Sequence, residues 1–155
     1  MPDDARAAYV EALKMLGRRE LSEAQVRQRL TRRGHDRAAI DAAVARLCDE
    51  RAIDDERVAA LIARAQSSTG RRGKLRVLRQ IEGAGIASTT ARRAVDEVFA
   101  GIDDDALLET SLVKRLRGRE RIADEAEFRR LYRYLIGQGF DADRIIRALK
   151  ARSVK

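Results

Sequence analysis

Apolar residues recur along this chain at the spacing of one helix face, and a glycine interrupts them at three equivalent places. The first segment has Val26, Leu30, Gly34, Ile40, Val44 and Leu47. The second has, 51 residues further on, Val77, Ile81, Gly85, Ala91, Val95 and Val98. The third has, another 54 residues on, Leu131, Leu135, Gly139, Ile145 and Leu149, with Arg152 as the one exception. The pattern predicts a pair of amphipathic helices, joined at a glycine and repeated three times.

The three glycines stand where a helix is expected to end in a tight turn. Glycine just past a helix end adopts the left-handed backbone conformation without a clash at Cβ. The next residue is Ile86 in the second segment and Phe140 in the third, and an apolar side chain there can pack onto the last helical turn. His35 occupies this place in the first segment. We interpret His35 as a packing or capping residue rather than a catalytic one.

A further amphipathic helix is predicted ahead of each pair. These helices span Ala5 to Leu16, Glu56 to Ala65 and Ala106 to Leu116. The chain is then divided into three tandem three-helix units, residues 1–52, 53–101 and 102–155. We predict an all-α fold in which the units form an elongated, curved array. Because a unit of about 50 residues buries little core by itself, stacking on neighbouring units is expected to matter.

Polar residues mark the expected helix starts. Ser22 with Gln25 three positions later is a capping-box pattern. Acidic runs at 54–56 and 103–105 fit helix N-termini, where carboxylates cap the backbone and suit the dipole. For the third helix of each unit we predict caps from Asp36, from Ser88 or Thr89, and from Asp141.

The composition excludes several classes of protein. One cysteine, Cys48, and one histidine leave no intrachain disulfide and make zinc catalysis or a Cys–His nucleophile a poor interpretation. Cys48 itself is predicted to be a small core residue. The sequence shows neither a phosphate-binding loop nor a His-Glu-x-x-His pattern, and the carboxylates fall mostly at helix starts. We expect no enzyme activity, no metal and no cofactor. No apolar run is long enough for a membrane span, and the acidic start has no signal region, so a cytoplasmic location is expected.

The charge balance favours a polyanionic partner. The formal net charge is +8, and 28 of the 33 basic residues are arginine. The planar guanidinium suits phosphate and carboxylate groups. A GC-rich genome explains the preference for arginine codons equally well, but it explains the positive excess less well. The excess therefore points to nucleic acid.

The basic residues form clusters in all three units. The second unit has an acid-free group at the start of its middle helix, where cations oppose the dipole and a binding role is favoured: Arg71, Arg72, Lys74, Arg76 and Arg79. The first unit has Arg27, Arg29, Arg32 and Arg33 near a helix C-terminus, where cations are favourable in any case. The third unit has Lys114, Arg115, Arg117, Arg119 and Arg121, then Arg129, Arg130 and Arg133, then Arg144, Arg147 and Lys150. The last three also fit an ordinary solvated helix face.

Tyr134 is the one aromatic candidate for a binding role. It lies near Arg130 on the predicted helix, off the centre of the apolar face. A tyrosine beside arginine can stack on an unpaired base. Packing at a seam between units is the alternative interpretation.

With its motifs in this order, the chain resembles the RecX family of RecA regulators. The resemblance rests on the run from Leu21 to Gly34, on Ile53-Asp54-Asp55-Glu56-Arg57, and on Gly139-Phe140-Asp141 continuing to Leu149. It covers nearly the whole chain, and the order and spacing of the motifs make it specific. The resemblance implies tandem three-helix repeats and binding in the groove of the RecA–DNA filament. It also implies negative control of filament growth, ATP hydrolysis, recombination and the SOS coprotease role.

Two other functions remain open from the residues alone. A DNA-binding module of helix-turn-helix type would use the helix–glycine–helix pairs, although no single base-rich recognition helix stands out. The alternative is an adaptor that binds only protein, in which the high arginine content would reflect a GC-rich genome. If the chain is a regulator of RecA, its expected partners are the RecA filament and single- and double-stranded DNA without sequence preference. No stripe suited to dimerisation is evident, so we expect a monomer.

Overall fold

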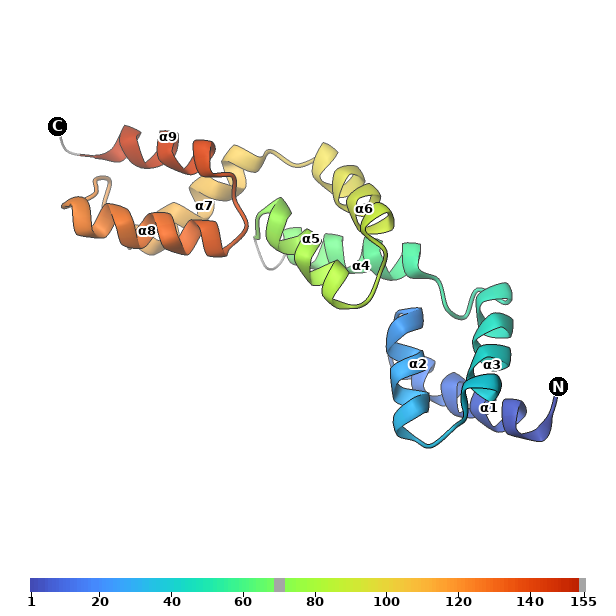
Figure 1. Cartoon of the computed structure of the whole chain (residues 1–155). Coiled ribbons are helices and arrows are strands. Elements are labelled where there is room, and N and C mark those ends of the chain that lie inside the picture. The colour runs from blue at the N-terminus through green and yellow to red at the C-terminus, as the bar shows by residue number, and fades with distance from the viewer. Residues whose placement is uncertain (69–71, 154–155) are drawn as a thin grey trace.

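The structure, a computed structural model, describes residues 1–68 and 72–153. Within these ranges the chain forms nine helices: α1 (Asp3–Leu16), α2 (Glu23–Arg32), α3 (Arg37–Asp49), α4 (Asp55–Ser68), α5 (Lys74–Gly83), α6 (Ser88–Ala100), α7 (Asp104–Leu116), α8 (Glu125–Gly137) and α9 (Ala142–Arg152). The helices follow one another in an elongated row with the two chain ends at opposite extremes (Figure 1). Apart from helices, the described residues form a single isolated bridge between Ile122 and Ser153. The all-α, elongated prediction is confirmed.

The buried apolar residues fall into three separate clusters, one for each group of three helices. We call α1–α3, α4–α6 and α7–α9 the first, second and third units. Leu21, Leu30 and Leu47 are fully buried in the first cluster. Val77 and Ile81 lie in the second, and Leu135 lies in the third. The exact limits between units stay a prediction, since the side chain of Ile53 packs in the first cluster.

Most predicted caps are present. The capping box of Ser22 and Gln25 is complete, and Asp36, Asp103 and Asp141 each accept backbone N–H groups at the starts of their helices. The prediction of Ser88 or Thr89 as a cap is wrong. Ala87 occupies the capping position of α6, and Ser88 is already the first helical residue. Our predicted first helices also begin late, because acids such as Asp3 and Asp104 lie inside the first turn.

The three glycine turns have the expected conformation. Gly34, Gly85 and Gly139 have φ angles of +91°, +81° and +93°. Ile86 and Phe140 behind the latter two are buried in the cores of their own units. The turns therefore close the helix pairs as the repeat predicts.

Neighbouring units meet through the same small contact at both junctions. The start of the middle helix of one unit lies against the glycine turn of the next unit. At the first junction the Ser22 hydroxyl donates to the Ala84 carbonyl over 2.5 Å. At the second, the Gly73 N–H donates to the Gln138 carbonyl over 2.8 Å. In the threefold repeat, Ser22 is equivalent to Gly73, and Ala84 is equivalent to Gln138.

Polar contacts complete the junctions. Arg57 of α4 donates to Glu20 over 2.9 Å, and the backbone N–H of Glu23 donates to Asp55 over 2.9 Å. The Arg76 guanidinium donates to the Gly137 carbonyl across the second junction over 3.2 Å. The stacking of neighbours thus rests largely on backbone and polar groups. The buried apolar clusters stay within units, and partly buried Leu107 packs against both the second and the third.

The first junction yields a stability prediction for Ser22. We expect Ser22→Ala to lower the free energy of unfolding by about 1–2 kcal/mol, because it removes a helix cap. It also leaves the Ala84 carbonyl without its donor, and Ser22 is fully buried. Urea denaturation measures the loss. The matched control is Ser88→Ala, whose residue makes no capping bond and should cost little. Equal losses for the two variants would contradict the role given to Ser22.

Candidate nucleic-acid interface

A basic cleft opens in the first unit where the ends of α1 and α2 come together. Its volume is about 480 Å³. It is lined by six bases, one acid and one methionine: Lys14, Arg18, Arg19, Arg29, Arg32, Arg33, Glu11 and Met15. We call it the first cleft. Helix C-termini favour cations, so the two converging helix ends help to hold this charge.

Glu11 anchors one side of the first cleft. It accepts from Arg33 over 2.8 Å and makes a 2.5 Å hydrogen bond with His35. The hydrogen bond from His35 lowers the pKa of the Glu11 carboxyl, and the charge of Arg33 adds to this. His35 therefore fixes the turn against α1, in agreement with a packing or capping role.

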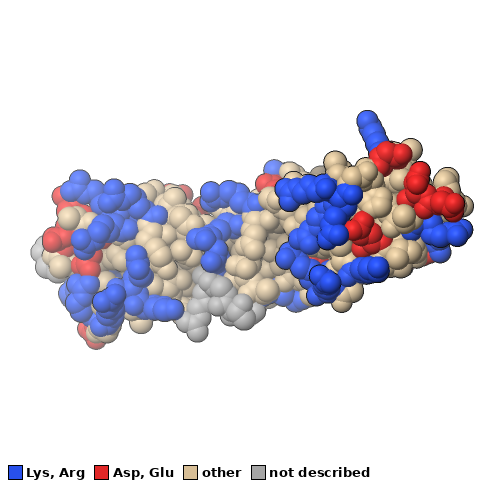
Figure 2. Space-filling view, turned by 90° about the horizontal axis from the view of Figure 1, so that it is seen from below, with Lys and Arg blue, Asp and Glu red and all other residues tan. Residues whose placement is uncertain are grey.

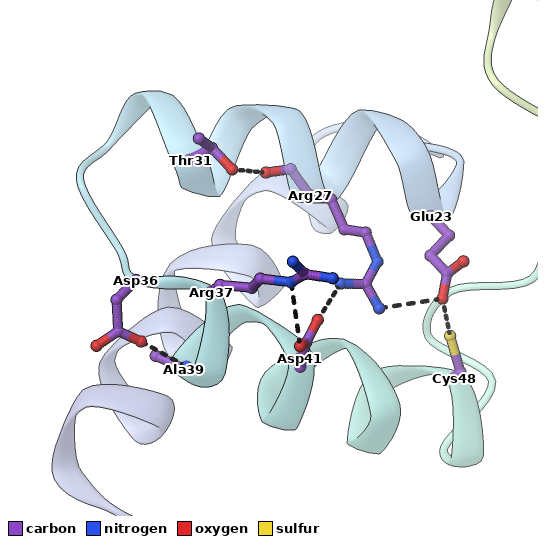
Figure 3. Close-up of polar contacts among 8 residues, drawn as sticks. All are labelled: Glu23, Arg27, Thr31, Asp36, Arg37, Ala39, Asp41 and Cys48. Atoms are coloured by element: carbon purple, nitrogen blue, oxygen red, sulfur yellow. Dashed lines mark hydrogen bonds and ion pairs between the residues drawn. The ribbon is translucent and has the colours of Figure 1, made fainter.

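The opposite side of α2 is electrically balanced. Figure 3 shows Arg27 and Arg37 directed toward Asp41 of α3. The Arg27 guanidinium lies 2.6 Å from Asp41 and 3.8 Å from Glu23. The first-unit arginines of the sequence cluster thus divide: Arg27 pairs within the unit, while Arg29, Arg32 and Arg33 line the cleft.

A second basic cleft lies in the third unit, between the end of α7 and α8. Its volume is about 310 Å³, and it is lined by Arg115, Arg117, Arg119, Arg130, Glu127 and Leu131. We call it the third-unit cleft. Arg117 is held with a φ of +51° at the end of α7. The chain turn there brings arginines that are distant along the sequence to one opening.

Glu127 makes the acidic floor of the third-unit cleft. Its carboxylate accepts from the Arg119 guanidinium and from the Ala123 backbone N–H, and its side chain is 10% exposed. These bonds hold the pKa of Glu127 at about 2, below the ordinary 4.5. Arg119 is therefore bound to a structural partner.

The lowered pKa of Glu127 predicts a pH dependence of stability. A carboxyl whose pKa falls on folding stabilises the fold above its unfolded pKa, and the gain is lost as pH falls through the folded pKa. We expect Glu127→Gln to be less stable than the parent at neutral pH, with the gap closing between about pH 4.5 and about pH 2. Urea denaturation across that range measures the gap. The stability difference between Arg119→Gln and the parent should also close in this pH range. A difference that does not change with pH in either variant would contradict the role given to the Glu127–Arg119 pair.

Tyr134 has an arginine neighbour on a second helix besides Arg130, which precedes it by four residues on α8. The Arg115 guanidinium carbon of α7 lies 4.0 Å from the centre of the Tyr134 ring, so Arg115 stacks on it. Tyr134 is partly buried against the third core, within one unit. This packing lies inside the third unit and not at a seam between units, and a stacking role for Tyr134 stays a prediction.

Three bases of the second-unit cluster contact different partners. Arg71 lies outside the described residues. Lys74 pairs with Asp96 over 2.6 Å, Arg76 is engaged across the junction, and Arg79 donates to the carbonyl of Leu75 in its own helix over 3.4 Å. Arg72 forms no ion pair with a described residue, and a binding role for this cluster stays a prediction.

The remaining third-unit candidates are mostly solvated. Arg144 pairs with Asp105 of α7 over 2.8 Å, which raises its pKa. The other candidates lie on exposed positions outside the third-unit cleft: Lys114, Arg121, Arg133, Arg147 and Lys150.

Cys48 and the carboxylates form no metal-binding group in the described ranges. The Cys48 thiol is partly buried against the first core and lies 3.6 Å from Glu23. Burial, with the Glu23 charge, raises its pKa. Across residues 1–68 and 72–153, no group of three or more His, Cys, Asp or Glu residues could hold a metal ion. No helix in these ranges is long and apolar enough to cross a membrane.

Comparison with known proteins agrees with the repeat architecture. Residues 8–47 match a family model described as "RecX, first three-helix domain". Over 134 residues the chain is 31% identical to "Regulatory protein RecX" from Syntrophotalea carbinolica, covering 86% of this chain and 88% of that protein. This chain belongs to the RecX family. A second RecX protein, from Halorhodospira halophila, is 30% identical over 141 residues, covering 90% of this chain and 84% of that one.

The RecX fold extends over the whole array. A crystal structure of RecX from Lactobacillus salivarius matches with a TM-score of 0.78 at 19% identity, covering 97% of each chain. The resemblance to RecX drawn from the sequence motifs is thereby confirmed. The structural comparison supports the fold, and the evidence for the basic clefts comes from the residues of this chain.

Sequence reasoning missed three of the six basic residues that line the first cleft. Lys14, Arg18 and Arg19 belong to the end of the first helix and the turn after it, far from Arg29 and Arg32 along the sequence. The sequence does contain one signal for them: both helices end in basic residues, and the short turn between the two helices keeps the helices close together. Only the packing shows that their basic ends share one cleft.

Proposed function

We propose that this chain binds RecA–DNA filaments in their groove and limits filament growth, ATP hydrolysis, strand exchange and coprotease activity. The observation that carries the proposal is an elongated RecX-type array with basic side chains gathered over the first and third units on one face (Figure 2), and with a basic cleft in each of these units. A groove-following ligand needs an extended surface, and a DNA-containing groove needs positive charge spread along it. The proposal is of a cytoplasmic monomer that acts by binding, with no catalytic step.

The experiment that tests the proposal is a titration of this protein into RecA turning over ATP on single-stranded DNA. It is run at two salt concentrations. Inhibition well below one copy per RecA is the expected result, and it would mean action on growing filaments. Inhibition only at levels that coat all free DNA, and lost at the higher salt, would favour a plain DNA-binding module. No effect at any level would overturn the proposal and favour a protein-only adaptor.

A further inference from the structure

Basic side chains gather at two places on one face of the molecule. Figure 2 shows Lys and Arg concentrated over the first unit and over the far end of the third unit, with fewer between them. The described clefts lie in these two units: the first cleft at the ends of α1 and α2, and the third-unit cleft between α7 and α8. The second unit separates them (Figure 1).

The first cleft holds charges that the protein itself does not neutralise. Among the described residues, Arg18, Arg19, Arg29 and Arg32 form no ion pair with an acid. Elsewhere arginines such as Arg57 are paired across elements. Like charges crowded around one opening repel each other, and a bound anion relieves that repulsion. The cleft is thus built to accept negative charge from outside.

The third-unit cleft is smaller than the first cleft, and two of its arginine side chains are held in place by neighbouring residues. Arg115 is held against the Tyr134 ring, and Arg119 is held by Glu127, so these guanidinium groups are positioned before any ligand arrives. Arg117 and Arg130 complete the lining. The charge of Arg130 contributes to the lowered pKa of Glu127, while Arg117 forms no ion pair with a described residue. Pre-positioned donors lose less side-chain entropy on binding.

The chemistry of both clefts fits a phosphodiester backbone. Guanidinium groups fork onto phosphate oxygens, and contacts of this kind carry no base preference. Neither cleft is lined by an exposed aromatic platform, and each has only one apolar lining residue, Met15 or Leu131. An apolar peptide would find little to bury there. A nucleic-acid backbone is a continuous line of charge, which can reach two basic clefts in separate units.

We propose that the first cleft and the third-unit cleft bind the backbone of one DNA molecule simultaneously, with the second unit spanning the gap. Binding at one cleft raises the effective concentration of the same DNA at the other. DNA shorter than the span engages one cleft only, and its affinity is correspondingly low. This inference deepens the proposed function by assigning which surfaces hold DNA, but its test contains no RecA, so either can fail alone.

The test measures affinity against DNA length with the purified full chain. Labelled duplexes from about 8 to about 40 base pairs are titrated by fluorescence anisotropy at several salt concentrations. Three variants are compared with the parent. The first-cleft variant has Arg18, Arg19 and Arg32 changed to Gln, and the third-unit variant has Arg115, Arg117 and Arg130 changed to Gln. The matched control has exposed Arg6, Arg37 and Arg92, which line neither cleft, changed to Gln.

For the parent, we expect affinity to rise by about 100-fold or more once the duplex reaches both clefts, beyond the gain from extra sites on a longer lattice. Each cleft variant should keep binding to short duplexes and lose this rise. Each should also reduce the slope of log K against log salt by up to about 3. The control should keep the rise, with the same lost formal charge.

Three results would overturn the inference. One is a parent curve without a step. Another is a control variant that loses affinity as much as the cleft variants, which would mean that net charge alone binds DNA. The third is unchanged DNA binding in both cleft variants, which would mean that the clefts do not hold the DNA backbone. Circular dichroism of each variant establishes that the helices are retained.

Discussion

Replacing Gly139 by alanine is expected to lower the free energy of unfolding by about 2–5 kcal/mol, the sum of a backbone and a packing cost. The backbone cost arises because Gly139 has a φ of +93°, which disfavours any side chain. The packing cost arises because a Cβ there would lie 2.2 Å from the backbone nitrogen of Arg76 and 2.4 Å from its Cβ. Both atoms belong to the second unit, so the clash falls on the junction.

Gly34 provides the matched control. It has nearly the same φ, +91°, at the equivalent position of the first unit, but nothing lies within 4 Å of the place that its Cβ would take. Gly34→Ala should therefore pay the backbone cost alone, about 1–2 kcal/mol. The difference between the two variants isolates the close approach of neighbouring units.

The measurement combines urea denaturation with small-angle X-ray scattering. If the Gly139→Ala protein relieves the clash by opening the second junction, the Gly73–Gln138 and Leu75–Gly139 backbone bonds break and the radius of gyration increases. The Gly34→Ala protein should scatter as the parent does. Equal stability losses and unchanged scattering for both variants would show that the junction is not held by this contact.

Local signals predict the helices and turns of this chain well because each is decided within a few residues. The glycine turns, the capping box at Ser22 and the aspartate caps all depend on neighbours along the chain. The one wrong cap is instructive. In every unit the capping residue stands two positions after the glycine, at Asp36, Ala87 and Asp141. Turn geometry therefore prevails over the capping preference of Ser88.

Contacts between distant segments could not be predicted in the same way. Gly34, Gly85 and Gly139 look alike in the sequence, yet only the last two lie against a neighbouring unit. The first cleft likewise joins basic residues from two helices, and Arg27 leaves the cluster because Asp41 faces it from α3. Which bases pair internally and which face solvent depends on packing, and linear charge runs do not contain that information.

Separate cores joined by narrow junctions predict that the units unfold one at a time. In quasi-one-dimensional repeat proteins, stability is the sum of the stability of each repeat and the interactions at its interfaces. Here the apolar clusters are distinct, and partly buried Leu107 is the residue that packs against both the second and the third. A defect in one core should therefore be felt mainly in its own unit.

Leu135→Ala is the variant that exposes this behaviour. Leu135 is fully buried in the third cluster, so truncation should cost about 2–5 kcal/mol. We expect its urea transition to become biphasic, with the third unit melting first. Tyrosine fluorescence reports on that step, because Tyr132 and Tyr134 lie in the third unit and Tyr9 is the only tyrosine elsewhere. Far-UV circular dichroism should retain most of its signal after the first step.

Two companion variants make the interpretation specific. Leu47→Ala removes an equally buried leucine from the first core at a similar cost in free energy. Its early step should therefore change the fluorescence of Tyr9 alone, which packs against that core, and leave the signal of Tyr132 and Tyr134 to the later transition. Val113→Ala, whose parent side chain is 47% exposed in α7, should change little. A single transition that coincides by both probes in all variants would instead mean that the junction bonds couple the three units into one cooperative structure. The narrow contacts at Gly85 and Gly139 would then contribute more to stability than their size suggests.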